Sequence, residues 1–310
     1  MIGLLLLAVF STAMAEADDR ACAGAEPQLD AAARALEARD FRKAQEILDP
    51  LEAGHPMCPA LLVTLGRAWQ GQGEFRKADT LSELAAAFAP ENPAALVFRG
   101  EMLSLRGAMP QAQVLLEKAC DLEPANASAH FELGMIFDRT RRQPQAVAEF
   151  RKVLELKPSS PRAWDYLALN LEPLGDTAGA ETSYQKGLAV NAGPDFDAFL
   201  DYNYGKFLMK LNRLEESRRH LDKAVQLAPK VRAVHYDRAK LSLRLGELED
   251  ARRDAERALS LPDPGGFILD LQVYSLLASI YTRLGQKELA QKYIDLAQQA
   301  SVPMRSRDRK

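Results

Sequence analysis

The sequence is poor in the side chains that most often build catalytic and metal sites. Its 310 residues include 4 His, 3 Cys and 2 Trp. The four histidines are His55, His130, His220 and His235, and none belongs to an HExxH pair or another i, i+4 pair of metal ligands on one helix face. CxxC, G-x-S-x-G, a phosphate-binding loop and a dinucleotide fingerprint are also missing. We therefore expect no catalytic residue, no metal, no cofactor and no enzyme activity.

A strong charge of one sign is missing as well. Lys and Arg number 40 and Asp and Glu number 43, which gives a formal net charge of −3. Because phosphate binding needs a basic face, this balance argues against nucleic acid as a partner. A short basic tail, residues 305–310, is the one place where contact with an anionic membrane is considered. Its alternative is a solvated chain end.

Long apolar runs are missing except at the N-terminus. Residues 1–15 carry no charge, are too short to span a bilayer comfortably, and end in Ala13-Met14-Ala15 before the acidic Glu16. This pattern predicts a signal peptide over residues 1–15, a polar segment over 16–24, and export to the periplasm or the exterior. No Lys or Arg precedes the apolar core, so an uncleaved tail or anchor stays as the alternative.

What the sequence does contain is a repeated pair of apolar stripes. In residues 127–160, Ile136 and Phe137 belong to a first stripe at helical spacing, and Phe150 and Val153 belong to a second. Pro144 suits the first turn of the second helix, and Pro158 ends that helix. A helical hairpin of this size cannot bury its apolar face alone, so it needs neighbours of the same kind.

The chain supplies these neighbours at intervals of 34 residues. One alanine position recurs at Ala44, Ala78, Ala112, Ala146 and Ala180, and small residues recur at Gly66, Gly100 and Gly134. Prolines recur at the exit of the second helix, at Pro56, Pro90, Pro124 and Pro158. We expect eight hairpins within residues 25–304, in windows near 25–58, 59–92, 93–126, 127–160, 161–194, 198–231, 232–265 and 271–304.

This pattern resembles the tetratricopeptide repeat over nearly all of the sequence after residue 24. The resemblance implies an all-α, right-handed superhelical solenoid of antiparallel helix pairs, stabilised by contacts between neighbouring pairs. Pro173 falls near the end of a first helix and should bend or shorten it.

Two of the three cysteines flank the first predicted hairpin. Cys22 precedes its first helix and Cys58 follows its second helix, so antiparallel helices bring them to the same end. In an oxidising compartment a Cys22–Cys58 disulfide is therefore a reasonable hypothesis. Cys120 is expected to be a buried thiol.

The family resemblance also implies that the first helices line the inside of the curve and bind an extended segment of a partner. Helical phase places a strip of tyrosines, cations and an amide there, together with Asp237. The proposed binding residues are Tyr166, Tyr202, Asn203, Lys206, Lys210, Tyr236, Lys240, Arg244 and Arg283. Such groups hold carboxylates through charge-assisted hydrogen bonds, which favours an acidic or C-terminal segment.

Three functions remain open at this point. The sequence favours an interaction scaffold or adaptor that binds a protein or peptide. The first alternative is a structural or assembly component of a cell-envelope secretion or polysaccharide-export complex, and the second is the non-catalytic part of an enzyme. The sequence leaves the oligomeric state open.

Overall fold

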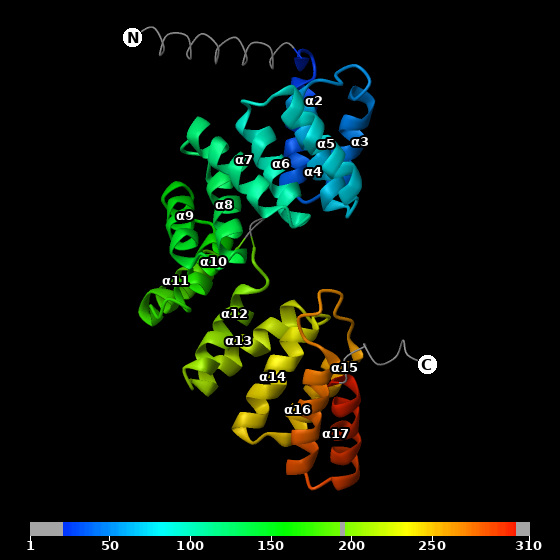
Figure 1. The fold of residues 1–310 in the computed structure, drawn as a ribbon, viewed down its shortest axis with the longest axis vertical. Helices are drawn as coiled ribbons and strands as arrows, with labels where there is room; N and C mark the ends of the chain where they lie inside the picture. Colours follow the sequence, from blue (N-terminus) through cyan, green and yellow to red (C-terminus); the bar gives the residue numbers. More distant parts are fainter. Residues whose placement is uncertain (1–20, 193–195, 302–310) are drawn as a thin grey trace. The chain divides into compact units, whose positions relative to one another are not determined.

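The computed structural model describes residues 21–192 and 196–301 (Figure 1). These residues form sixteen α-helices, α2–α17, and one short 3-10 helix, and they contain no β-strand. The predicted signal peptide, the first part of the polar segment and the basic tail lie outside the described residues. None of the helices in the described part combines the length and the apolar character that crossing a bilayer requires.

The chain divides into two compact units, unit 1 up to Phe196 and unit 2 from Asp197. Unit 1 contains five helical hairpins, and a 3-10 helix, Asp49–Leu51, follows the first. Their helices are α2 Glu26–Glu37 and α3 Phe41–Leu48, α4 Pro59–Gly71 and α5 Phe75–Phe88, α6 Pro93–Leu105 and α7 Met109–Leu122, α8 Ala127–Arg139 and α9 Gln143–Leu156, α10 Pro161–Leu171 and α11 Thr177–Val190.

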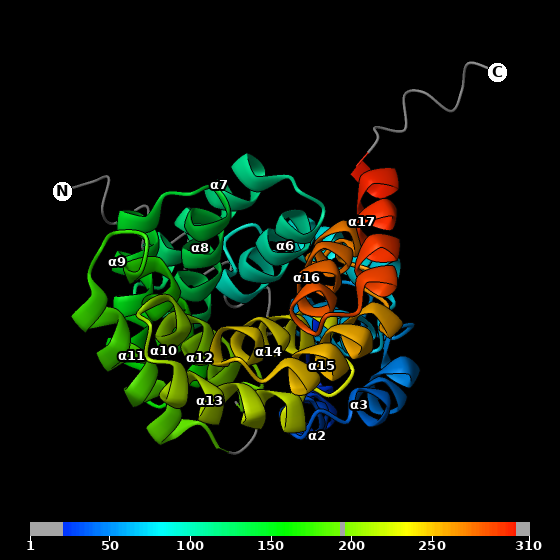
Figure 2. The same cartoon turned by 90° about the horizontal axis from the view of Figure 1, so that it is seen from below.

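Unit 2 contains three hairpins of the same kind. Their helices are α12 Leu200–Lys210 and α13 Leu214–Leu227, α14 Arg232–Leu245 and α15 Leu248–Ser260, α16 Asp270–Arg283 and α17 Lys287–Ser301. Within each unit, a first helix contacts its own second helix and the second helix of the preceding hairpin, and α4, α6, α8, α14 and α16 also contact the preceding first helix. The first helices therefore form one layer of each unit and the second helices form another. In unit 1, α7, α9 and α11 lie outside α6, α8 and α10 (Figure 2).

Glycines on the first helices allow each hairpin to close. A Cβ atom at Gly134 would lie 2.9 Å from the ring of Phe150, and one at Gly205 would lie 2.9 Å from Leu221 Cγ. Both Phe150 and Leu221 come from the second helix of the same hairpin and are fully buried. The recurring small residue thus marks the point where the two helices pack closest.

The two units begin their first helices differently. In unit 1 the side chains of Asn92, Asn126 and Ser160 accept hydrogen bonds from backbone N–H groups in the first turns of α6, α8 and α10. In unit 2 the corresponding N-cap residues of α12 and α14 are Phe199 and Val231, whose side chains cannot accept such a bond. Polar N-caps contribute about 1 kcal/mol each, so helix starts in unit 2 depend more on packing.

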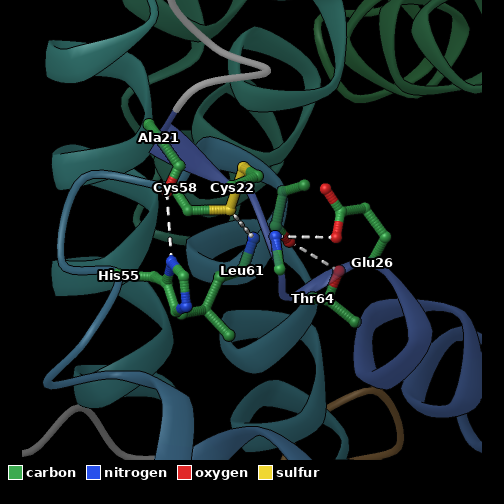
Figure 3. Close-up of a disulfide and its surroundings, with 9 residues drawn as sticks. Ala21, Cys22, Glu26, His55, Cys58, Leu61 and Thr64 are labelled. Atoms are coloured by element: carbon green, nitrogen blue, oxygen red, sulfur yellow. Dashed lines mark hydrogen bonds between the residues drawn. A yellow bond between two sulfur atoms is a disulfide. The ribbon is translucent and has the colours of Figure 1, made fainter.

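A disulfide joins Cys22 to Cys58, the pair considered from the sequence (Figure 3). Cys58 also begins α4, and its Sγ accepts a hydrogen bond from the backbone N–H of Leu61 at 3.3 Å. His55 Nδ1 lies 3.4 Å from the carbonyl oxygen of Ala21, beside the disulfide. The bond therefore ties the segment before the first hairpin to the start of the second. Cys120 is a free thiol and half-buried.

Candidate functional site

Four of the predicted binding residues gather around Asp237, which is 4 % exposed. The hydroxyl of Tyr202 donates to Asp237 Oδ2 at 2.7 Å, and Lys240 Nζ donates to Oδ1 at 3.1 Å. Lys206 Nζ lies 3.8 Å from Oδ2. The two ammonium groups also lie over tyrosine rings, Lys206 over Tyr202 at 4.8 Å and Lys240 over Tyr236 at 5.3 Å. We call these five residues the Asp237 cluster.

Asp237 offsets part of the positive charge that the sequence suggests for this strip. Burial raises the pKa of the Tyr202 phenol, and the charge of Asp237 raises it further. Burial also raises the pKa of Tyr236, against the opposing charge of Lys240. Both phenols therefore stay protonated and act as hydrogen-bond donors. Lys206 Nζ lies farther from the Asp237 carboxylate than Lys240 Nζ does, so Asp237 neutralises its charge less fully.

Arg244 and Arg283 connect neighbouring hairpins of unit 2. Arg244 Nη1 donates to the Met209 carbonyl oxygen at 2.7 Å and Nη2 to Asn212 Oδ1 at 2.8 Å, both at the end of α12. Arg283 Nη1 donates to the carbonyl oxygen of Leu243 at 2.7 Å, near the end of α14. The Met209 and Leu243 carbonyl oxygens already accept backbone N–H groups in the turns that end their helices, so each arginine adds a further hydrogen bond to a helix end.

The same arrangement occurs in unit 1. Arg139 Nη1 lies 3.3 Å from the carbonyl oxygen and 3.0 Å from the hydroxyl of Ser104, near the end of α6. Arg139, Arg244 and Arg283 occupy the same position of their repeat windows. Arg139 and Arg283 end α8 and α16, and Arg244 is the last but one residue of α14. Their shared position indicates that these arginines first of all join neighbouring hairpins, whether or not they also bind a partner.

The remaining predicted residues are divided between the units. Asn203 is half-buried and Lys210 is exposed on α12 of unit 2. Tyr166 belongs to α10 of unit 1, where its ring stacks on Phe150 at 5.5 Å and meets the edge of Phe131 at 5.8 Å. Of the predicted binding residues, Tyr166 thus belongs to unit 1 and all the others belong to unit 2.

Unit 1 contains a cavity of about 250 Å³ that opens on its first helices. Its lining residues come from α4, α6, α8, α9 and α10 and from the loops beside them. They include Arg67, Val97, Glu101, Phe131, Glu132, Val153, Lys157 and Arg162. We call it the unit 1 cavity. Most of these residues lie on first helices, the layer that the family resemblance makes the ligand surface, but the sequence gives no sign of a cavity there.

Two carboxylates in the unit 1 cavity have unequal surroundings. Glu101 is bonded on both oxygens, by Arg67 Nη1 at 3.2 Å and by Gln70 Nε2 at 2.5 Å. Glu132 has no hydrogen bond or ion pair with any residue that the structure describes. Burial and the neighbouring charge of Glu101 raise the pKa of Glu132 to about 7, against the opposing charges of Arg162, Arg67 and Arg139.

Three histidines pair with carboxylates at one repeat position. His130 Nδ1 lies 2.6 Å from Glu149 Oε2, and its Nε2 lies 3.0 Å from the Pro124 carbonyl oxygen. His235 Nδ1 lies 3.5 Å from Asp254 Oδ1 in the same arrangement. These contacts agree with the packing function that their shared repeat phase indicates. Within the described part of the chain, no group of three or more His, Cys, Asp or Glu side chains is arranged to hold a metal ion.

The third pair has the two residue types exchanged. In the α12–α13 hairpin the acid is on the first helix and the histidine on the second, and His220 Nδ1 lies 2.8 Å from Asp201 Oδ1. Each of the three pairs is separated by 19 residues. That spacing is the signal by which sequence reasoning could have found the partners.

The helical pairs match a known family in three stretches. Residues 110–161 and 205–267 match one family model described as the tetratricopeptide repeat, and residues 271–301 match a second model of that description. The chain contains tetratricopeptide repeats. The all-α architecture of antiparallel helix pairs agrees with this assignment.

Solved tetratricopeptide-like structures share the fold. A structure titled for PilF of Pseudomonas aeruginosa matches with a TM-score of 0.59 at 19% identity, over 67% of this chain and 91% of that chain. The Cut9–Hcn1 assembly of APC/C gives a TM-score of 0.71 at 18% identity, over 80% of this chain and 48% of that chain. PilW, titled a type IV pilus biogenesis factor, gives 0.59 at 20% identity, over 67% and 92%.

At these identities the likeness establishes the fold alone. No curated protein matches the sequence.

Proposed function

We propose that the chain is a non-catalytic scaffold that holds an extended segment of another protein against its first helices. The observation that carries this proposal is the unit 1 cavity, which opens on four consecutive first helices and contains a carboxylate, Glu132, without a partner among the described residues. A stack of hairpins does not need such a group for its own stability, because an unpaired charge beside apolar walls is costly. A bound segment can supply the missing contact.

The Asp237 cluster is the proposed second contact, and it suits a carboxylate of the segment. Lys206 and Lys240 are both partly exposed, at 36% and 42% of their side-chain area, and Lys210 is exposed next to them on α12. The Tyr236 hydroxyl adds a donor. An acidic side chain or a C-terminal carboxylate of the partner fits this set better than a neutral group does.

Export to the periplasm or the cell exterior is the proposed location. The Cys22–Cys58 disulfide supports it, because cytosolic reductants keep most protein thiols reduced. A disulfide that joins two segments 36 residues apart serves a structural purpose and needs an oxidising compartment to persist.

The experiment is a quantitative capture from the native host, with the full chain as bait. We expect at least one protein that wild type captures and that Lys206→Ala/Lys240→Ala loses. The matched control is Lys230→Ala/Lys287→Ala, which removes the same charge from exposed positions outside the cluster. The purified complex should also weaken as salt rises from about 0.05 to 0.5 M, since ions screen exposed charge pairs. Equal capture by the two double variants would remove the Asp237 cluster from the proposal.

An assembly component of a cell-envelope secretion or polysaccharide-export complex is the second candidate. It is favoured by the printed titles of two structures with the same fold, which concern PilF and the pilus biogenesis factor PilW. Light scattering separates the two candidates. A monomer that gains mass only on adding the captured protein supports the scaffold, whereas concentration-dependent self-association of the chain supports the assembly component.

A further inference from the structure

We propose that the unit 1 cavity binds one basic side chain, an arginine or a lysine, with its cationic head between Glu101 and Glu132. This inference rests on the proposed function for the segment that carries the side chain. The cavity itself can be tested with a small cation, independently of any protein partner.

Charged side chains on neighbouring first helices pair with one another, except at Glu132. Arg67 on α4 bonds Glu101 on α6, so this pair is closed. Glu132 on α8 is the next acid, and it has no bonded partner in the described part of the chain. Two carboxylates beside the same cavity repel each other, and a cation placed between them removes that repulsion. The space beside the Glu132 carboxylate is therefore where we expect a positive group to bind.

The size and lining of the unit 1 cavity fit a long basic side chain. Val97, Phe131 and Val153 supply apolar walls, and the two carboxylates supply the polar end. Lysine and arginine carry a charged head on an apolar stem, which such a lining matches. The volume of about 250 Å³ is below the roughly 300–1,000 Å³ of sites for drug-sized ligands, so it suits a single side chain.

The cations that line the cavity each have an interaction already, which argues against an anion site. Arg162 lies over the ring of Phe131 at 4.9 Å, which holds its guanidinium against the wall. Arg139 at the end of α8 bonds Ser104. Lys157, after α9, interacts with other residues in the structure. The charged groups around Glu132 are Arg67, Glu101, Arg139, Lys157 and Arg162. Glu132 differs from them in having no hydrogen bond, ion pair or ring contact with the described residues.

Binding of a cation should release the proton that Glu132 keeps near neutral pH. Since the pKa of Glu132 is about 7, most of its carboxyl groups carry a proton at pH 6 and few do at pH 8. A cation binds the charged form, so affinity should rise by up to about tenfold between these two values. The opposite trend is expected for an anion, which would accept a hydrogen bond from the protonated form.

The test uses n-butylguanidinium as the probe and the full chain labelled in its valine methyl groups. The neutral isostere, n-butylurea, is the probe control. We expect butylguanidinium to shift the Val97 and Val153 methyl resonances, more tightly at pH 8 than at pH 6, and butylurea to bind about tenfold more weakly or not at all. Glu132→Gln should abolish the pH dependence and weaken binding about tenfold, while Glu155→Gln, an exposed acid on α9, should leave both unchanged.

The change in affinity caused by Arg162→Met distinguishes a cation site from an anion site. Its loss removes a repelling charge, so butylguanidinium should bind more tightly to this variant than to wild type. The proposal is overturned if butylurea binds as well as butylguanidinium, or if acetate binds instead and Arg162→Met abolishes that binding. Partner capture that persists while the probe fails would reject the cavity as a cation site and keep the scaffold. A probe that binds while no partner is captured would reject the scaffold and keep the site.

Discussion

His130 and Glu149 meet in the interior of the α8–α9 hairpin, where imidazole Nδ1 lies 2.6 Å from the carboxylate. Their side chains are 5% and 11% exposed, so the pair is almost entirely removed from water. Asp201 and His220 occupy the same two positions of the α12–α13 hairpin in the reverse order. Three hairpins, α8–α9, α12–α13 and α14–α15, thus carry an acid and a histidine at this level, and either order occurs.

Exchanging the two residues tests this tolerance. His130→Ala should lower the free energy of unfolding by about 2 kcal/mol, because it leaves Glu149 Oε2 without its partner while Lys152 Nζ still donates to Oε1. The double exchange His130→Glu/Glu149→His should recover about half of that loss, with the remainder due to the missing bond to Pro124. Urea denaturation of the three proteins measures this, and a double variant as unstable as His130→Ala would contradict it.

Acid should weaken the α12–α13 hairpin through Asp201, which is 1% exposed. Burial alone would raise the pKa of Asp201, but the hydrogen bonds and charges of His220 and Lys223 outweigh burial and hold the pKa below its usual value. A lowered pKa in the folded state gives stability that is present above the unfolded value of about 3.9 and is lost as pH falls through the folded value.

We therefore expect Asp201→Asn to cost about 3 kcal/mol at pH 7, and this difference from wild type to shrink below about pH 4. The control is Asp250→Asn, which removes an acid from a solvent-exposed pair with Arg253 and should change stability by less than about 0.5 kcal/mol. Denaturation midpoints at pH 7, 4 and 3 provide the comparison. A constant cost of Asp201→Asn at all three pH values would count against the electrostatic explanation.

Reduction of the disulfide should loosen the first hairpin selectively. Closing a loop across 36 residues stabilises by about 4 kcal/mol in the chain-entropy account. Since α2 and α3 end the stack, we expect Cys22→Ser/Cys58→Ser to speed amide hydrogen exchange in these helices and to leave α8 and α9 as in wild type. Cys120→Ser is the control for loss of a thiol. Uniform acceleration across unit 1 would mean that the disulfide supports the whole unit.

Arg244 should contribute to stability and only secondarily to binding. Arg244→Ala removes hydrogen bonds to the Met209 carbonyl and to Asn212, at a cost of about 1–2 kcal/mol. Arg244→Lys keeps the charge but cannot make both bonds, so it should recover only a small part. Parallel measurement of thermal unfolding and partner affinity decides between the two functions. An unchanged melting temperature together with lost affinity would restore Arg244 as a binding residue.

The repeat made much of the fold predictable, because every stacked hairpin needs small residues, apolar residues and helix-ending prolines at the same positions. Helices α4, α6, α8 and α10 begin at the first residues of the 34-residue windows. Pro173 shortens the first helix that precedes it, and α10 ends at Leu171. The Cys22–Cys58 pairing followed from the antiparallel course of one hairpin. All of these depend on local chain geometry, which the sequence expresses directly.

For the candidate site, the sequence predicted which residues lie on the strip but not how their side chains pair. Helical phase put Lys206, Lys240 and Tyr202 on one strip, but it could not show that buried Asp237 would collect all three. Nor could it distinguish Glu132, which has no bonded partner in the described residues, from the many paired acids. Both outcomes depend on which side chains from different hairpins come within bonding distance, and the period does not encode this.

The links that Arg139, Arg244 and Arg283 make have a consequence for how such a chain can change. Each guanidinium donates to a main-chain oxygen of the preceding hairpin, and every amino acid provides that acceptor. This main-chain part of the link therefore places no demand on the identity of the acceptor residue, although Arg139 and Arg244 add a bond to the side chains of Ser104 and Asn212. A hairpin that carries the arginine can follow almost any other hairpin, so gene duplication and loss can lengthen or shorten the stack without matched mutations in its neighbours.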